Sequence, residues 1–339
     1  MIRLGLAAVA VTIAVQASSA AEWTLQAVPA AGPVKAIETL PDGPAVFIGQ
    51  GWFRLLTDGN RLRLVATAGP SQLPHPPNAL PDGRIAEGSG DIARVWLAEP
   101  TGRYDHGVLG DAIEAGSLVV QRRDGRRDLV ELPADAVFED LRPRIADLGD
   151  GGSKIVVVKS YLARGSALAV IGERNGKFEV VAETPPIGTP HRWLNPAGIA
   201  DFNGDGTIDI AVVKMPHALG LLELWSWRDG ALHKTLEFDG VANHVIGSRA
   251  LQMSAVADFD GDGRPDLAIP SFDRRELRLI GFAPEVRDIA RISLPSRAAT
   301  DFALIKDANG HPAVLLGLEN GALVLARTAS AARQPKREP

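Results

Sequence analysis

Two acidic loops of identical spacing are the residues of this chain best suited to chemistry. Each has oxygen side chains at loop positions one, three, five and nine: Asp201, Asn203, Asp205 and Asp209 in the first, and Asp258, Asp260, Asp262 and Asp266 in the second. Oxygen ligands at alternate positions suit a hard cation such as Ca²⁺, which takes about six to eight oxygens at roughly 2.3–2.6 Å. The spacing therefore predicts two calcium sites.

Glycine occupies position six of both loops, at Gly206 and Gly263. A chain folding around an ion must turn sharply there, and glycine does so without strain. Position seven is held by Thr207 and Arg264, which we include in the expected metal sites. The alternative is a pair of Asp-Gly turns without metal, because such turns are common between strands.

An EF-hand is excluded as an interpretation of these loops. That motif needs an acidic residue at position twelve and flanking helices, whereas position twelve here is Val212 or Ile269, each within a run of β-formers. A third, weaker copy at 147–155 is one residue short and has Lys154 near the place of the closing aspartate. Metal binding by this third copy is left open.

The loops belong to a longer repeat of four short strands. In the second half of the chain, first strands at 144–147, 198–201 and 255–258 each lead into a loop and then into a β-rich second strand. Third and fourth strands follow, separated by turn residues such as Asn175-Gly176 and Asp229-Gly230. Repeated four-stranded sheets bury their faces by packing radially around an axis. We predict an all-β fold, a β-propeller.

Blade number and closure follow from the ends of the repeat. We count six four-stranded blades, with an irregular seventh within 71–133 as the alternative. The unit around 78–133 is the least regular and contains a long polar stretch from Thr101 to Gly116. The last unit ends one strand short, while residues 22–28 have no unit of their own. An N-terminal strand that completes the last blade would close the ring and protect its edges.

The paired loops resemble those of FG-GAP/VCBS repeats, the β-propeller blades also found in integrin α-chains. The resemblance is specific at 201–209 and 258–266, is clearest over 143–294, and elsewhere depends on strand periodicity. It implies a loop between the first and second strands of a blade that holds calcium. It carries no integrin function, because a shared fold says little about activity.

The N-terminus predicts export. Residues 1–20 combine Arg3, an apolar stretch from Leu4 to Val15 and small residues at the end, which is typical of a signal peptide. The apolar stretch is too short to span a bilayer, and no later stretch is long enough. We therefore expect a periplasmic or secreted protein without membrane insertion, with a propeller over 21–328 and a disordered tail over 329–339.

Composition excludes several function classes. The chain of 339 residues has no cysteine and a formal charge of −5. Disulfides, thiol catalysis and a lipoprotein anchor are thereby excluded, and the charge gives no footprint for nucleic acid. The hydrolase elbow GxSxG and the zinc motif HExxH are also missing. The seven histidines are scattered, and we interpret each as an isolated surface or turn residue.

A ligand site is predicted near two arginines. Arg192 and Arg249 each precede a calcium loop by nine residues, and equivalent positions in adjacent blades lie at equivalent radii. Side by side, they would suit an anionic group, and His191 and Trp193 would add a stacking surface. The alternative is that each arginine pairs with a local carboxylate.

We therefore expect a calcium-stabilised binding module for a protein or glycan partner, as a monomer. The other class of function is a propeller enzyme, a lyase or hydrolase acting on polysaccharide, with a site that the sequence does not reveal. Whether the chain is an enzyme stays open, with a binding role favoured.

Overall fold

The fold is known from a computed structural model, which describes residues 22–58, 61–70, 74–88, 90–307 and 309–329. This part of the chain forms 25 strands, β1 to β25, and all strand pairs are antiparallel. The expected signal peptide, 1–20, and all but Ala329 of the expected tail lie outside the described residues. Within these residues, no helix is long and apolar enough to cross a membrane.

The first three blades occupy the N-terminal half of the chain. Blade 1 comprises β2 (Val34–Leu40), β3 (Gly43–Ile48), β4 (Gly51–Asp58) and β5 (Arg61–Thr67). Blade 2 comprises β6 (Ala86–Glu87), β7 (Ile92–Thr101), β8 (Glu114–Arg122) and β9 (Arg127–Glu131). Blade 3 comprises β11 (Arg144–Asp147), β12 (Ser153–Tyr161), β13 (Gly165–Arg174) and β14 (Lys177–Glu183).

The other three blades complete the ring. Blade 4 comprises β15 (Leu194–Ala200), β16 (Asp209–Lys214), β17 (Leu221–Arg228) and β18 (Ala231–Asp239). Blade 5 comprises β19 (Ala255–Ala257), β20 (Asp266–Pro270), β21 (Glu276–Gly281) and β22 (Arg287–Ser293). Blade 6 comprises β23 (Ala303–Lys306), β24 (Pro312–Gly317), β25 (Leu323–Thr328) and the N-terminal strand β1 (Trp23–Val28).

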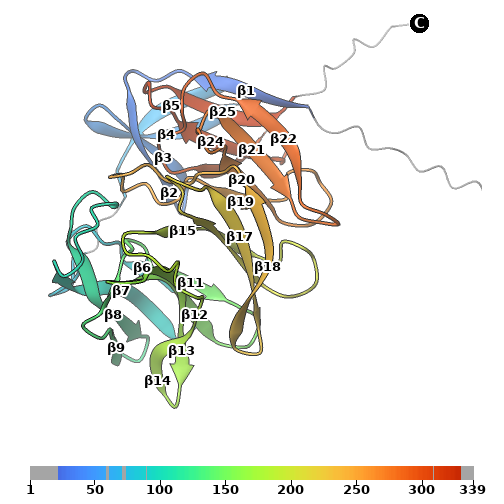
Figure 1. The fold of residues 1–339 in the computed structure, drawn as a ribbon. Coiled ribbons are helices and arrows are strands. Elements are labelled where there is room, and N and C mark those ends of the chain that lie inside the picture. The colour runs from blue at the N-terminus through green and yellow to red at the C-terminus, as the bar shows by residue number, and fades with distance from the viewer. Residues whose placement is uncertain (1–21, 59–60, 71–73, 89, 308, 330–339) are drawn as a thin grey trace, which may run out of the picture.

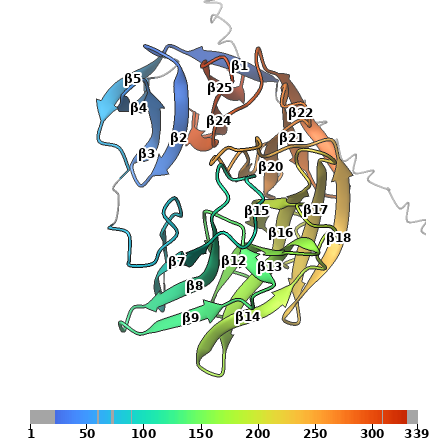
Figure 2. The same ribbon diagram turned by 60° about the vertical axis from the view of Figure 1, so that its left-hand side comes forward.

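The ring has six blades and is closed by its first strand, as the sequence predicts. The blades follow one another around a common centre (Figure 2). Strand β1 pairs with β25 from Trp23↔Thr328 to Val28↔Leu323, so the two ends of the described chain lie side by side in this blade (Figure 1). The irregular region 78–133 forms one blade, so the seventh blade is not present in the described residues.

One short strand was not predicted. Strand β10 (Ala136–Phe138) lies between blades 2 and 3 and pairs with both β8 and β12. It joins the two blades into a continuous nine-stranded sheet. The strand is fully buried, and the residues that follow it, Glu139 and Asp140, are buried too. The two residues after β10 therefore place charged side chains in the interior of the propeller.

The apolar core lies between neighbouring blades. Its largest part joins blades 2, 3 and 4 and includes Trp225 and Trp227 of β17, which therefore pack between blades. Three further clusters join blades 4 and 5, blades 5 and 6, and blades 6 and 1. Among the described residues, none of these clusters joins blade 1 to blade 2. The seam between those two blades is instead crossed by ion pairs of Glu38 with Arg84 and Arg142.

Candidate functional site

The two faces of the ring carry different chemistry. In an antiparallel blade, the turn between the first and second strands lies at one end of the sheet. The turn between the second and third strands, and the link to the next blade, lie at the other end. The acidic loops 201–208 and 258–265 are turns of the first kind. Loops 102–113, 184–193, 215–220 and 240–254 are of the second kind, so they gather on the opposite face.

Both acidic loops adopt the same hydrogen-bonded conformation. The first carboxylate accepts three backbone N–H groups: Gly204, Asp205 and Gly206 donate to Asp201 at 2.8–3.1 Å, and the equivalent three donate to Asp258 at 2.7–3.1 Å. The glycines at position six have φ of 83° and 86°, a region that favours glycine. The turn expected at position six is confirmed.

The second loop gathers carboxylates closely enough for one ion. Oxygen atoms of Asp258, Asp260 and Asp262 all lie within 4.8 Å of one another. Atoms bound to one Ca²⁺ at roughly 2.3–2.6 Å can be no farther apart than about 5.2 Å, so the three fit a shared cation. Asp266 is only 2 % exposed, and burial together with Asp260 and Asp262 raises its pKa to about 7. A bound cation would favour its charged form.

In the first loop the closing residue Asp209 is fully buried, accepting a hydrogen bond from Phe202 N and one from the Ser226 hydroxyl. Burial raises its pKa. Arginines at the rim pair with ligand-position carboxylates in both loops, Arg228 with Asp205 and Arg287 with Asp260, each at 2.6 Å. Arg264 also pairs with Asp262 at 3.2 Å, while Thr207 N donates to Asp205. Both loops contain the oxygen donors that calcium prefers, but among the described residues only the second brings three carboxylates within reach of one ion.

The third, degenerate loop contains its own cation. Lys154 Nζ lies 2.6 Å from Asp150 Oδ1 and 3.3 Å from the carbonyl oxygen of Gly151. The side chain is largely buried and its ammonium lies 6.0 Å from the ring of Trp227. Asp150 has its pKa lowered by hydrogen bonds, first of all that from Lys154, against the effect of burial. The Lys154 ammonium thus places a positive charge inside the loop and balances the carboxylate of Asp150.

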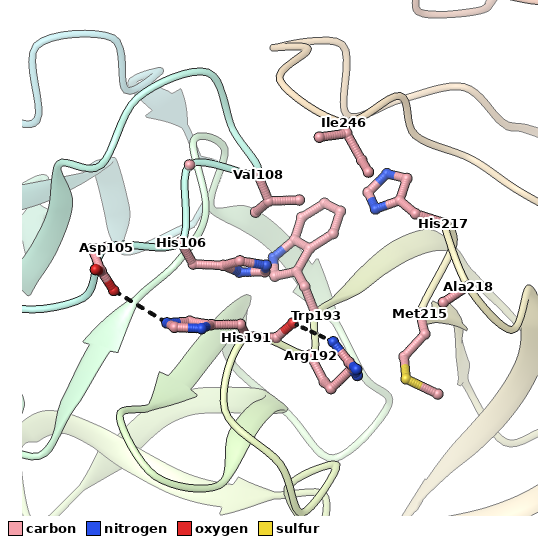
Figure 3. A pocket seen from close by; sticks show the side chains of 11 residues that line it. Asp105, His106, Val108, His191, Arg192, Trp193, Met215, His217, Ala218 and Ile246 are labelled. Carbon is pink, nitrogen blue, oxygen red and sulfur yellow. Dashed lines mark hydrogen bonds and ion pairs between the residues drawn. The ribbon is translucent and has the colours of Figure 1, made fainter.

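A cavity of about 380 Å³ lies on the opposite face, between the loops of blades 2, 3 and 4. We call it the histidine pocket. It is lined on one side by His106 and His191, on the other by His217 and Ile246, with Arg192 and Trp193 between them (Figure 3). Loop 102–113, the polar stretch noted in the sequence, supplies the wall that carries His106.

The interpretation of the histidines as isolated residues is wrong for four of the seven. His106 and His191 stack with ring centroids 5.2 Å apart, and His217 and His244 lie 5.0 Å apart. Trp193 packs against the second pair: it stacks on His217 at 6.3 Å and meets His244 edge-on at 4.7 Å. The four come from four different loops, so their positions in the sequence show no period.

Three of these histidines have one ring nitrogen within hydrogen-bond or ion-pair distance of a protein group, and His244 has both. His106 Nδ1 lies 2.6 Å from Glu139 Oε1, and His191 Nε2 lies 3.2 Å from Asp105 Oδ1. His217 Nε2 lies 2.9 Å from His244 Nδ1, and His244 Nε2 lies 2.8 Å from the Ser248 carbonyl oxygen. Burial lowers the pKa of His217 to about 4 and that of His244 to about 3. Both rings are therefore neutral at pH 7.

His191 is also held in an unusual backbone conformation. Its φ is 55°, in the left-handed region that residues other than glycine seldom adopt. The backbone N–H of His191 donates to the Tyr104 hydroxyl at 2.8 Å, and the two rings lie 5.2 Å apart. Backbone strain of this kind persists where surrounding contacts impose it, often at ligand sites.

The two arginines expected to act together line different cavities. Arg192 lines the histidine pocket, and within the described part of the chain no carboxylate lies within ion-pair distance of it. Arg249 pairs with Asp82 at 3.0 Å and Asp111 at 3.2 Å and lines a cavity between blades 1 and 2. The local ion pair named as the alternative therefore describes Arg249. Trp193 lines the pocket but is only 2 % exposed, and its indole N–H donates to the Glu139 carbonyl.

Sequence reasoning missed His106, His217 and His244, although a signal existed. The four-strand repeat fixes which loops share a face, and loops 102–113, 184–193, 215–220 and 240–254 share one face. Sorting histidines by face instead of by spacing along the chain would have placed these three beside His191. Glu139 carried no such signal, because β10 has no counterpart in the repeat.

Comparisons with known proteins find distant structural likenesses only. No protein-family model matches, and no curated protein matches the sequence. Crystal structures of BBS1N in complex with ARL6DN are similar in fold. The one soaked with mercury shows 14% identity over 88% of this chain and 79% of that chain, with a TM-score of 0.40. The one soaked with lead shows 11% identity over 91% and 96%, with a TM-score of 0.48.

The strand pairing by itself defines the class: the chain is a six-bladed, closed β-propeller. Loops on the faces of such a scaffold are free to carry binding residues while the sheets hold them in place. In this propeller one face carries the acidic loops, and the other carries the histidine pocket.

Proposed function

We propose that the protein is a calcium-stabilised β-propeller that binds an acidic glycan through the histidine pocket. The observation that carries this proposal is Arg192, a cation without a carboxylate partner among the described residues, in a cavity of about 380 Å³. Arg192 is exposed at the pocket, and among the described residues its guanidinium donates one hydrogen bond, from Nη1 to the His191 carbonyl oxygen at 3.3 Å. Its remaining donors suit a carboxylate or sulfate, which a guanidinium can bind through two parallel hydrogen bonds.

The rest of the pocket favours a sugar over an acidic protein side chain. Histidine ring nitrogens that are not held from behind offer acceptors for hydroxyl groups, which a sugar has in abundance and an aspartate or glutamate side chain lacks. Val108, Met215 and Ile246 add apolar surface for the carbon face of a sugar ring. The volume lies within the range of about 300–1,000 Å³ that is usual for small-ligand sites.

In this proposal, calcium binds the two acidic loops on the face opposite the histidine pocket. The two loops with complete donor sets belong to blades 4 and 5, and blade 4 supplies His217 to the pocket. Each loop concentrates carboxylates that repel one another until a cation binds. A calcium-bound ring would therefore keep the pocket loops in fixed positions.

Further parts of the proposal depend on sequence alone. We propose export to the periplasm or the outside of the cell on the strength of residues 1–20, and we propose a monomer that binds no nucleic acid. A protein partner stays the alternative to the glycan.

The test is calorimetric titration of the mature protein, in millimolar calcium, with acidic and neutral oligosaccharides of equal length. We expect binding of the acidic series only. Arg192→Ala should weaken it by about 10- to 100-fold, as expected for loss of a hydrogen bond to a charged group worth about 1.5–3 kcal/mol, with an unchanged thermal melt.

Arg249→Ala is the matched control. Because Arg249 is already paired with Asp82 and Asp111, this change should lower the melting temperature and leave glycan affinity unchanged. Equal binding of acidic and neutral sugars, or full affinity in Arg192→Ala, would contradict the proposal. Binding of acidic peptides alone would favour the protein partner.

A further inference from the structure

His106 has the surroundings of a general base. Its Nδ1 lies 2.6 Å from Oε1 of Glu139, a side chain with no exposed surface. The other carboxylate oxygen of Glu139 accepts hydrogen bonds from the hydroxyls of Ser160 and Ser166, the latter at 3.2 Å. A buried carboxylate that holds one imidazole nitrogen fixes both the tautomer and the orientation of the ring.

The tautomer follows from these contacts. Burial raises the pKa of Glu139, while hydrogen bonds from His106, Ser160 and Ser166 favour its charged form. As a carboxylate, Glu139 accepts the hydrogen carried by His106 Nδ1. In the neutral ring Nε2 then carries a lone pair, and within the described residues it has no hydrogen-bond partner. Figure 3 shows the His106 ring in the wall of the pocket, stacked against His191. A lone pair held in a pocket wall is what proton abstraction requires.

The positive charge of the pocket resides on Arg192. The neutral His244 ring must donate from Nε2 to the Ser248 carbonyl oxygen, so its Nδ1 accepts a hydrogen bond from His217 Nε2. Nδ1 of His217 then bears a lone pair and no charge. The pocket thus combines one fixed cation, Arg192, with the neutral ring of His217 and with His106, whose Nδ1 lies against the Glu139 carboxyl group.

We propose that the histidine pocket is a proton-transfer site, where His106 Nε2 removes the proton from the carbon next to a carboxylate held by Arg192. The substrate class is a uronic acid or another sugar carboxylate with a hydrogen on that carbon. This inference rests on the proposed function, because an acidic sugar must first bind.

The step balances without a further reagent. The C–H bond breaks, an N–H bond forms at Nε2, and the electron pair delocalises into the carboxylate as an enediolate. Arg192 stabilises the charge that develops on the carboxylate oxygens, and Glu139 stabilises the imidazolium. The pair returns when the carbon takes a proton back from Nε2, which exchanges with solvent in the meantime. Where the next carbon bears an oxygen substituent, the pair can instead expel it, and His106 protonates the departing oxygen.

The experiment follows the hydrogen on that carbon by ¹H NMR in D₂O. The probe is a galacturonate oligosaccharide, incubated with the full mature protein in millimolar calcium. We expect loss of the signal through exchange, or a new alkene signal through elimination. His106→Gln should slow the reaction by about 10²- to 10⁴-fold, the usual contribution of a general base, while calorimetry shows that the probe still binds. His106→Asn is a second variant, should the first fail to fold.

Glu139→Gln tests the positioning residue, and His233→Gln is the matched control. Glu139→Gln should slow exchange while the probe still binds, because the amide no longer stabilises the imidazolium. His233 lies exposed on β18, outside the pocket, and its replacement should change nothing. Binding without exchange or elimination in the unmodified protein would overturn this inference and leave the proposed function standing. An unchanged rate in His106→Gln would also overturn it, and absence of binding would overturn both.

Discussion

His244 is buried to 1 % exposure, and this determines how it responds to pH. Burial lowers its pKa to about 3, from 6.5 in the unfolded chain. Between these values the unfolded chain binds a proton that the native protein does not, so stability falls as pH drops below about 6.5. Each pH unit in that window costs at most about 1.4 kcal/mol for this group.

We therefore predict that acidification from about pH 7.5 to 5.5 destabilises the protein less in His244→Gln than in the unmodified chain. Urea unfolding at both pH values measures the difference. The comparison with the variant is needed because Glu114 acts in the opposite direction. Burial raises the pKa of Glu114 to about 10, from 4.5. Between these values the native protein keeps a proton that the unfolded chain has lost, so stability falls as pH rises. Equal pH dependence in both proteins would contradict the prediction.

Residue positions that follow from a local spacing rule could be predicted from the sequence, whereas positions that depend on contacts between blades could not. Gly206 and Gly263 were placed correctly in tight turns because a local spacing rule governs them. The approach of His106 to His217 was not predictable in this way, since blade order and loop length bring them together. Glu139 depends on β10, which pairs with two blades at once and repeats nowhere in the chain.

At the level of elements, three related loops have different means of balancing their acidic groups. The loops of blades 4 and 5 have complete sets of oxygen ligands, whereas the loop of blade 3 places the Lys154 ammonium 2.6 Å from Asp150. A bound cation and this ammonium would repel each other, so calcium should be excluded from blade 3. The chain should then bind two calcium ions.

We predict that elemental analysis of the purified protein finds two calcium ions per chain, that Asp258→Ala retains one, and that Asp147→Ala retains both. Calcium at 100 times its dissociation constant should stabilise the fold by about 2.7 kcal/mol per site relative to EGTA. Extracellular modules bind calcium at about 10⁻⁴–10⁻³ M, so the protein must be kept in millimolar calcium. Loss of one ion in Asp147→Ala would show that the third loop binds metal, and identical melts in calcium and EGTA would exclude stabilisation.

Elements with strong local patterns were predicted well. The strand Arg144–Asp147 was located within the repeat at its observed bounds. Strand β15 was expected to start at Gly198 but begins at Leu194. The extra residues include Pro196 and lie at a shift in register, where turn and strand preferences conflict. Such boundaries depend on contacts with the neighbouring blade.

At the scale of the whole molecule, the seams between blades are not equivalent. Four apolar clusters join neighbouring blades, but within the described residues none crosses from blade 1 to blade 2, where Glu38 pairs with Arg84 and Arg142. Polar pairs at a partly exposed seam contribute less than apolar burial. The ring therefore depends strongly on blade 6, in which β1 joins the two ends of the chain.

Deletion of residues 22–28 tests this dependence on closure. Strand β1 supplies the only partner of the outer edge of β25 among the described residues. Val28 is buried between blades 6 and 1, and the ring of Trp23 meets Phe259 of blade 5 at 5.7 Å. Removal exposes the backbone of β25 and the apolar surface beneath, and an unpaired edge strand invites pairing with another chain.

We predict that the deletion variant has a lower melting temperature and forms oligomers, measured by light scattering after size exclusion in millimolar calcium. Full burial of a large apolar side chain contributes about 1.5–3 kcal/mol. The deletion removes the buried Val28 and the partly buried Trp23 and Leu25, so the melt should shift clearly. Truncation of residues 330–339, which the sequence predicts to be disordered, is the matched control and should change neither property. If the shortened protein stayed monomeric with an unchanged melt, β1 would be dispensable, and the ring would close through its side-chain packing alone.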